Sequence, residues 1–202
     1  MLREFIDLSI IQRIILLGEY IMNKGKVVII GGNKRAGKST LGRLLQTKYG
    51  YNYYNMDHIT NSADSAWFKD GLPLNDYFPF MESLIEYALT DASRHGINSV
   101  FEFIYSPEVY NKLKSKDNLE FYYLANLDLN DDNIRAILIK YSKDYEYSSR
   151  IEDVERNVKV ILDLNKKLKD ECNKYNVELI NTSYGEKRDK IINDLSLEIV
   201  NK

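Results

Sequence analysis

The chain has 202 residues, of which 44% are hydrophobic, and this length suits one α/β domain with a proper core rather than two. Its 28 basic and 30 acidic residues give a net charge of −2 and form no Lys/Arg block, so we expect neither nucleic acid nor a membrane among its partners. The single cysteine, Cys172, excludes an internal disulfide, and we expect a cytoplasmic protein.

The first 21 residues differ from the rest of the chain. Apolar residues recur there at helical spacing: Ile6, Ile10, Ile14 and Leu17. Charged residues interrupt the segment, so it lacks the roughly 20 apolar residues that a membrane span needs. Two interpretations stay open for residues 1–21: an accessory helix packed on the domain, or an extension upstream of a true start at Met22.

A glycine-rich run follows, between a β-branched segment (27–30) and a helix-like segment (41–48). It fits the phosphate-binding pattern G-x-x-x-x-G-K-[ST] with Gly32, Asn33, Lys34, Arg35, Ala36, Gly37, Lys38 and Ser39. Backbone N–H groups in such a loop, together with the start of the next helix, bind a polyphosphate. Lys38 is then expected to reach the β- and γ-phosphates and Ser39 to approach Mg²⁺. Thr40, the next residue, is expected to help bind the nucleotide. A glycine-rich turn without a ligand would explain the glycines but not the Lys-Ser pair.

Strand and helix patterns then alternate along the chain. We expect strands at 27–30, 51–56, 99–104, 119–124 and 177–180. We expect helices at 41–48, 79–95, 107–113, 131–141, 151–172 and around 191–199, with a polar stretch containing Trp67 before the second helix. This alternation predicts an α/β fold with three layers, in which a parallel sheet is covered on both faces. Right-handed crossovers would bring the P-loop, Asp57, Glu102 and the segment 181–183 to one edge of that sheet.

These features resemble the P-loop kinases of small molecules, the group that holds nucleoside, nucleotide, shikimate and gluconate kinases. The resemblance covers Lys26 to Lys202 and rests on the P-loop, Asp57, a charged stretch at about 126–150 and the exit of strand five. It implies one domain over 22–202, a sheet in the order 2-3-1-4-5, a lid at about 126–150, and ATP and Mg²⁺ as cofactors. It also implies that Thr182 and Ser183, at the strand-five exit, lie near the adenine.

Asp57 ends the second predicted strand, where a carboxylate can take the proton of an acceptor hydroxyl. The alternative is that Asp57 caps the following helix. The neighbouring residue, His58, is expected to point elsewhere.

Glu102 interrupts an apolar strand, and a carboxylate there is costly unless it is paired or linked to a metal. We therefore expect Glu102 to join Ser39 in holding Mg²⁺, directly or through water. The alternative places Glu102 on an edge strand, facing solvent. By analogy with the kinases, Arg150 is the cation that a closing lid would bring to the transition state.

The sequence thus predicts an ATP- and Mg²⁺-dependent kinase of a small molecule, with Asp57, Lys38 and Arg150 as catalytic residues. Nucleosides and nucleotides are the leading acceptor class. Two alternatives stay open: a nucleotide-binding regulator or accessory ATPase without a small-molecule acceptor, and a kinase-like toxin acting on sugar nucleotides. A closed cavity beside Asp57 would favour a kinase over a regulator.

Overall fold

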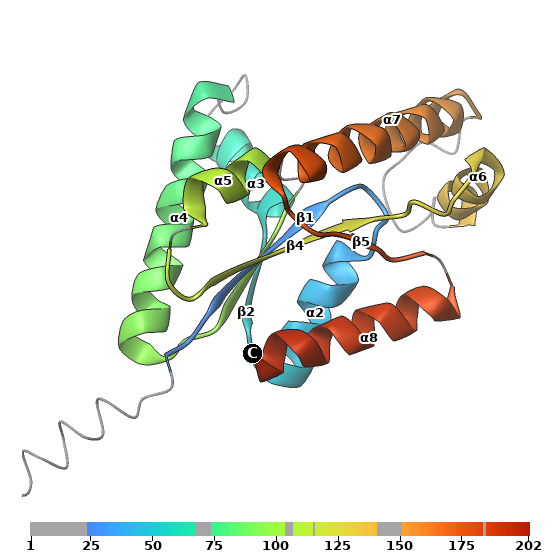
Figure 1. The fold of residues 1–202 in the computed structure, drawn as a ribbon. Helices are drawn as coiled ribbons and strands as arrows, with labels where there is room; N and C mark the ends of the chain where they lie inside the picture. Colours follow the sequence, from blue (N-terminus) through green and yellow to red (C-terminus); the bar gives the residue numbers. More distant parts are fainter. Residues whose placement is uncertain (1–23, 68–73, 104–106, 115, 141–150, 184) are drawn as a thin grey trace, which may run out of the picture.

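The computed structural model describes residues 24–67, 74–103, 107–114, 116–140, 151–183 and 185–202. Five parallel strands form one sheet in the order β2-β3-β1-β4-β5, which confirms the predicted α/β class and strand order. The strands are β1 (Val27–Gly32), β2 (Asn52–Asn55), β3 (Ser99–Glu102), β4 (Leu119–Ala125) and β5 (Leu179–Asn181). Helices lie on both sides of this sheet (Figure 1).

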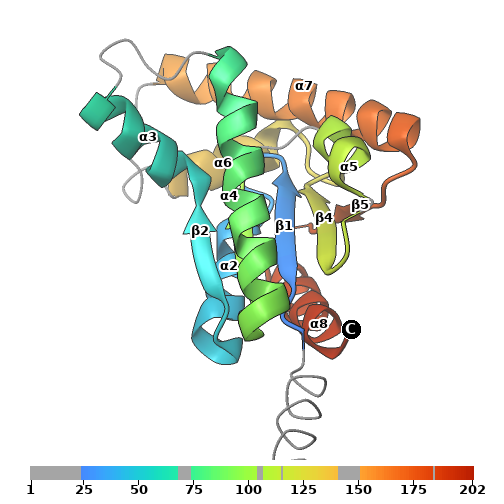
Figure 2. The same cartoon turned by 90° about the vertical axis from the view of Figure 1, so that its left-hand side faces the viewer.

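One face of the sheet is covered by α2 (Lys38–Tyr49) and α8 (Glu186–Asn201). The opposite face is covered by α4 (Leu74–His95), α5 (Pro107–Leu113) and α7 (Ile151–Tyr175). Figure 2 shows α4 lying over the sheet and α7 running across the end toward which β1 and β2 point. Two further helices, α3 (Met56–Trp67) and α6 (Asp131–Lys140), follow β2 and β4 at that same end.

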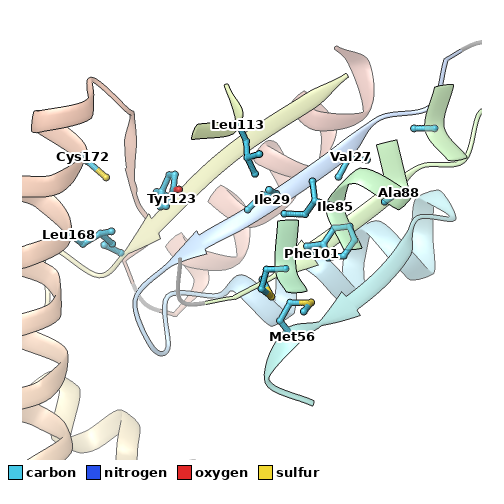
Figure 3. Packing of buried hydrophobic residues seen from close by; sticks show 13 residues of the cluster. Val27, Ile29, Met56, Ile85, Ala88, Phe101, Leu113, Tyr123, Leu168 and Cys172 are labelled. Atoms are coloured by element: carbon cyan, nitrogen blue, oxygen red, sulfur yellow. The ribbon is translucent and has the colours of Figure 1, made fainter. Parts of the chain in front are cut away.

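The central strand β1 is buried along its whole length, because both of its faces contribute to the core. Val27 and Ile29 pack with α4 and α7, in the cluster drawn in Figure 3. Val28 and Ile30 point the other way, toward α2 and α8. Side chains of a strand alternate between its faces, so a strand covered on both sides needs the continuous apolar run that the sequence has here.

Several predicted boundaries were wrong. The second strand ends at Asn55, and the polar stretch after it forms helix α3. Helix α4 begins at Leu74 and contains Pro79, which we had placed at its start; a helix that accommodates proline there forgoes one backbone hydrogen bond. The fifth strand begins at Leu179, because the N–H of Val177 bonds the carbonyl of Cys172 at 2.9 Å and closes the end of α7.

Among the residues that the structure describes, no helix is both long and apolar enough to cross a bilayer. Cys172 is buried in the core, as predicted. The segment 1–21 and the second part of the predicted lid, 141–150, lie outside the described residues.

Candidate active site

The P-loop joins β1 to α2 through a turn that requires glycine at both ends. Gly32 has φ 120° and Gly37 has φ 90°, values that residues with a side chain rarely adopt. A Cβ atom at Gly32 would also collide with the backbone of Leu124. Because the N–H of Asn33 bonds the carbonyl of Leu124 at 2.9 Å, the loop is fixed to the neighbouring strand.

Asn33 fastens the same loop to helix α7. Its side-chain amide is buried and donates to the carbonyl of Ile161 and to Oδ1 of Asn165, at 2.7 Å each. The side chain of Asn165 in turn donates to the carbonyl of Asn126, at 3.0 Å, just beyond the end of β4. A chain of buried amides thus connects the P-loop with α7 and β4, although the residues involved lie far apart in the sequence.

Lys38 is buried, with 7% of its surface exposed, at the first position of α2. Its ammonium group donates to the carbonyl of Asn33, at 2.8 Å, and is not paired directly with a carboxylate. Burial lowers the pKa of Lys38, while the nearby carboxylates of Glu102 and Asp57 raise it. The ammonium therefore lies inside the loop beside two acids, and the bond that holds it is one that a phosphate oxygen can replace.

Glu102 ends β3 and is 5% exposed. The predicted alternative, an edge-strand residue facing solvent, was wrong, because β3 lies between β2 and β1. One carboxylate oxygen, Oε1, accepts a hydrogen bond from the hydroxyl of Ser39 at 3.0 Å. The other, Oε2, accepts from the hydroxyl of Tyr53 at 2.6 Å and from the amide of Asn55 at 3.0 Å.

Asp57 lies in the first turn of α3 and is exposed. The cap of this helix is supplied by Asn55, whose Oδ1 accepts the N–H of His58 at 3.1 Å, so the hydrogen bond expected from a capping Asp57 comes from another residue. Partial desolvation and the charge of Glu102 raise the pKa of Asp57, and the charge of Lys38 lowers it. These mutual effects place Asp57 within electrostatic reach of both buried charges.

Thr182 and Ser183 follow β5 and are both buried. The hydroxyl of Thr182 donates to the carbonyl of Ala125 at 3.2 Å and to Oδ1 of Asn126 at 3.0 Å, so it joins the ends of β4 and β5. The hydroxyl of Ser183 donates to the carboxylate of Asp128 at 2.9 Å and, with Asn181, lowers the pKa of Asp128. A contact between Thr182 or Ser183 and an adenine ring stays a prediction.

The remaining predicted residues divide into two groups. Within the P-loop, Ala36 is fully buried and Lys34 and Arg35 are half-buried, while Thr40 is exposed on the first turn of α2. Arg150, predicted to act from the lid, lies outside the described residues. The structure therefore gathers the P-loop, Asp57 and Glu102 at the carboxyl ends of the strands, as the sequence predicted.

The oxygen atoms of Ser39 and Glu102 are ligands that suit a hard divalent cation. Mg²⁺ prefers oxygen ligands and takes only one or two from the protein, together with substrate phosphates and water. The hydroxyl of Ser39 and the carboxylate of Glu102 provide such a pair. Within the described residues, no group of three His, Cys, Asp or Glu side chains is placed to hold a metal by itself.

Sequence reasoning missed three residues that complete the site, namely Tyr53, Asn55 and Asn165. Each acts through a contact between elements that are distant in the sequence. One local signal was present for Tyr53: Gly42 sits inside a helical pattern, and such a glycine indicates that another group approaches closely. In the structure that group is the ring of Tyr53.

The loop, the helix behind it and the strand order together define the P-loop architecture. No protein-family model matches the chain. A segment of 69 residues is 33% identical to a probable gluconokinase of Rattus norvegicus and covers 33% of this chain and 37% of that protein. The match thus spans little more than a third of the relative's length, and within it the resemblance to small-molecule kinases is confirmed.

Two solved structures align with most of this chain. A shikimate kinase from Acinetobacter baumannii in complex with shikimate is 19% identical, with 91% of this chain and 98% of that chain covered at a TM-score of 0.49. A gluconokinase from Sinorhizobium meliloti is 14% identical, with 88% and 97% covered and a TM-score of 0.49.

Proposed function

We propose that this protein is a kinase that transfers the γ-phosphoryl group of ATP to a hydroxyl group of a small molecule. The observation that carries the proposal is the convergence of Lys38, Glu102 and Asp57 at the carboxyl ends of the strands, around a P-loop. The three residues come from three elements, and the carboxylates of Glu102 and Asp57 oppose the lowering of the Lys38 pKa that burial causes. A purely structural role does not account for a buried lysine inside a phosphate-binding loop.

The P-loop residues would bind the β- and γ-phosphates of the nucleotide. Lys38 would exchange its bond to the Asn33 carbonyl for bonds to phosphate oxygens. Their negative charge would compensate the buried positive charge of the ammonium group. The Ser39 and Glu102 oxygens would hold Mg²⁺, which neutralises charge on the transferred phosphoryl group when bound. Positioning and charge stabilisation are most of what phosphoryl transfer asks of a protein.

Asp57 would receive the proton. The oxygen of the acceptor hydroxyl forms a bond to the γ-phosphorus, the bond from that phosphorus to the bridging oxygen breaks, and ADP leaves. The hydroxyl proton passes to the Asp57 carboxylate, whose raised pKa makes it a better base than an ordinary aspartate. Exposure of Asp57 leaves it open to a small molecule arriving from solvent.

The test is acceptor-dependent ADP formation by the full chain with ATP and Mg²⁺, over a panel of nucleosides, sugars, sugar acids and polyols. We expect one chemical class to raise ADP formation well above the rate with water, and Lys38→Ala to remove that increase. ADP formation that no acceptor changes, and that Asp57→Asn leaves unaltered, would overturn the kinase proposal in favour of a regulator or accessory ATPase.

A further inference from the structure

Strand β2 carries two adjacent tyrosines that face opposite sides of the sheet. Tyr54 stacks on Phe101, with ring centroids 4.7 Å apart, in the core beneath α4. Tyr53 faces α2 instead, on the side to which Asn55 and Glu102 also point. The register pairs Asn55 with Glu102, so Tyr53 stands two residues back on the same face.

Helix α2 has a glycine in its interior, at Gly42, where glycine is less favourable than alanine. The space that the missing side chain leaves is filled by the ring of Tyr53, and a Cβ atom at position 42 would collide with that ring. Gly42 does not have a positive φ, so backbone conformation is not the reason for this glycine. The close approach of the Tyr53 ring is enough to explain why position 42 is glycine.

The hydroxyl of Tyr53, seated in this way, reaches Oε2 of Glu102 at 2.6 Å. Asn55 donates to the same oxygen at 3.0 Å, so two donors from β2 hold one side of the carboxylate. Its other oxygen, Oε1, is left facing Ser39. The orientation of the carboxylate toward the P-loop is therefore set by residues outside the loop.

We propose that Tyr53, held in place by the absence of a side chain at Gly42, is a positioning residue that fixes the Glu102 carboxylate for a divalent cation beside Ser39. The inference rests on the proposed function, because it assumes that Ser39 and Glu102 hold a cation with a nucleotide. Hydrogen bonds to a ligating carboxylate tune metal affinity, and removing such a partner typically costs about 10- to 100-fold.

The experiment measures Mn²⁺ binding to the full chain with saturating ADP, from the loss of the free Mn²⁺ signal in electron paramagnetic resonance. Mn²⁺ suits the same oxygen ligands as Mg²⁺. We expect Tyr53→Phe to weaken Mn²⁺ binding about tenfold, the low end of such losses, and to leave ADP affinity in EDTA unchanged. Tyr54→Phe, which removes a hydroxyl from the opposite face of the same strand, is the matched control and should leave Mn²⁺ affinity unaltered.

Two further variants separate positioning from general damage. Gly42→Ala keeps every polar group but displaces the Tyr53 ring, and we expect it to reproduce the Mn²⁺ defect. In a Glu102→Gln background, Tyr53→Phe should have no further effect on Mn²⁺ affinity, because its target is already altered.

Two outcomes would count against the account, and they differ. Equal Mn²⁺ affinities in wild type, Tyr53→Phe and Gly42→Ala, with the wild type still binding Mn²⁺ and ADP, would overturn the role of Tyr53 alone. A wild type that binds neither ADP nor Mn²⁺ would overturn the proposed function together with this inference.

Discussion

The two ends of the central sheet differ in how their charged side chains are paired. Near the amino end, Lys26 and Glu120 form an ion pair at 3.1 Å, with side chains that keep 17% and 24% exposure. At the carboxyl end, Lys38 and Glu102 are buried, and the lysine bonds a backbone carbonyl rather than an acid. At the amino end, Lys26 and Glu120 are thus paired with each other and need no ligand to balance their charges.

At the carboxyl end, the burial of the Lys38 and Glu102 charges costs free energy that no ion pair between them offsets. Burying charges without a direct partner is unfavourable, and structures retain such groups where a ligand or a reaction needs them. The comparison predicts that changes at the carboxyl end should affect nucleotide binding and turnover more than stability. Changes at the amino end should do the reverse.

The largest effect is expected from Asp57→Asn. Asparagine keeps the shape but removes the base, so kcat with the identified acceptor should fall by about 10²- to 10⁴-fold while ATP affinity barely changes. The fold raises the pKa of Asp57, which means that it disfavours the ionised carboxylate. At neutral pH the substitution should therefore leave the melting temperature unchanged or slightly higher. Full activity in Asp57→Asn would show that Asp57 is not the base and that another residue takes the proton.

Ser39→Ala tests the cation at the carboxyl end. The loss of one oxygen ligand should raise the Mg²⁺ concentration needed for half-maximal activity by about tenfold, an effect of the order seen for altered metal environments. ATP affinity measured by calorimetry in EDTA should change little, because the loop N–H groups remain. An unchanged Mg²⁺ dependence would remove Ser39 from the proposed cation site.

Asn165→Leu tests the buried amide chain, since it keeps the branched shape but removes one of the two acceptors of the Asn33 amide and the only donor to the Asn126 carbonyl among the bonds described above. A buried polar group left unsatisfied costs about 1–3 kcal/mol, so the melting temperature should fall by several degrees. ATP affinity should fall several-fold as well, because the P-loop loses one of its two hydrogen bonds to α7. Asn157→Ala, on the same helix with a bond only to its own turn, is the control and should change neither quantity noticeably.

The smallest effect is expected at the amino end, from Lys26→Met. Its ammonium pairs with Glu120 and also donates to the carbonyl of Ile199 at 2.9 Å. Partly exposed contacts of this kind contribute about 1 kcal/mol or less, so chemical denaturation should show a small loss of stability. Kinetics and ATP affinity should match the wild type, and a clear loss of ATP affinity would contradict the separation of the two ends.

The parts of the site that the sequence revealed are those fixed by local patterns. The P-loop has a set spacing within eight residues, Asp57 stands out as an acid after a predicted strand, and Glu102 as an acid within an apolar strand. Parallel topology then brings these segments to one edge of the sheet, whatever the details of packing. The strand order itself came from the resemblance to kinases and not from the strands.

The parts that the sequence did not reveal depend on contacts over long separations. Asn165 is 132 residues from Asn33, and nothing near either position marks the pair. Helix α3 was missed although its residues are amphipathic, and its start is set by the N–H of His58 donating to the side chain of Asn55. Tyr53 was missed although the sequence shows a glycine inside a helix at Gly42. Such a glycine indicates that some group approaches closely, but it does not identify which group.

The most direct test of the central claim is a calorimetric titration of the full chain with ATP and Mg²⁺, comparing the wild type with Lys38→Met and Lys26→Met. Burial disfavours the Lys38 charge in the absence of a ligand, so methionine there should not lower the melting temperature. We expect Lys38→Met to lose about 10- to 100-fold in ATP affinity, the range for hydrogen bonds to a charged group, while Lys26→Met binds as the wild type does. Equal ATP affinity in all three proteins would contradict the assignment of the carboxyl end as the phosphate-binding site.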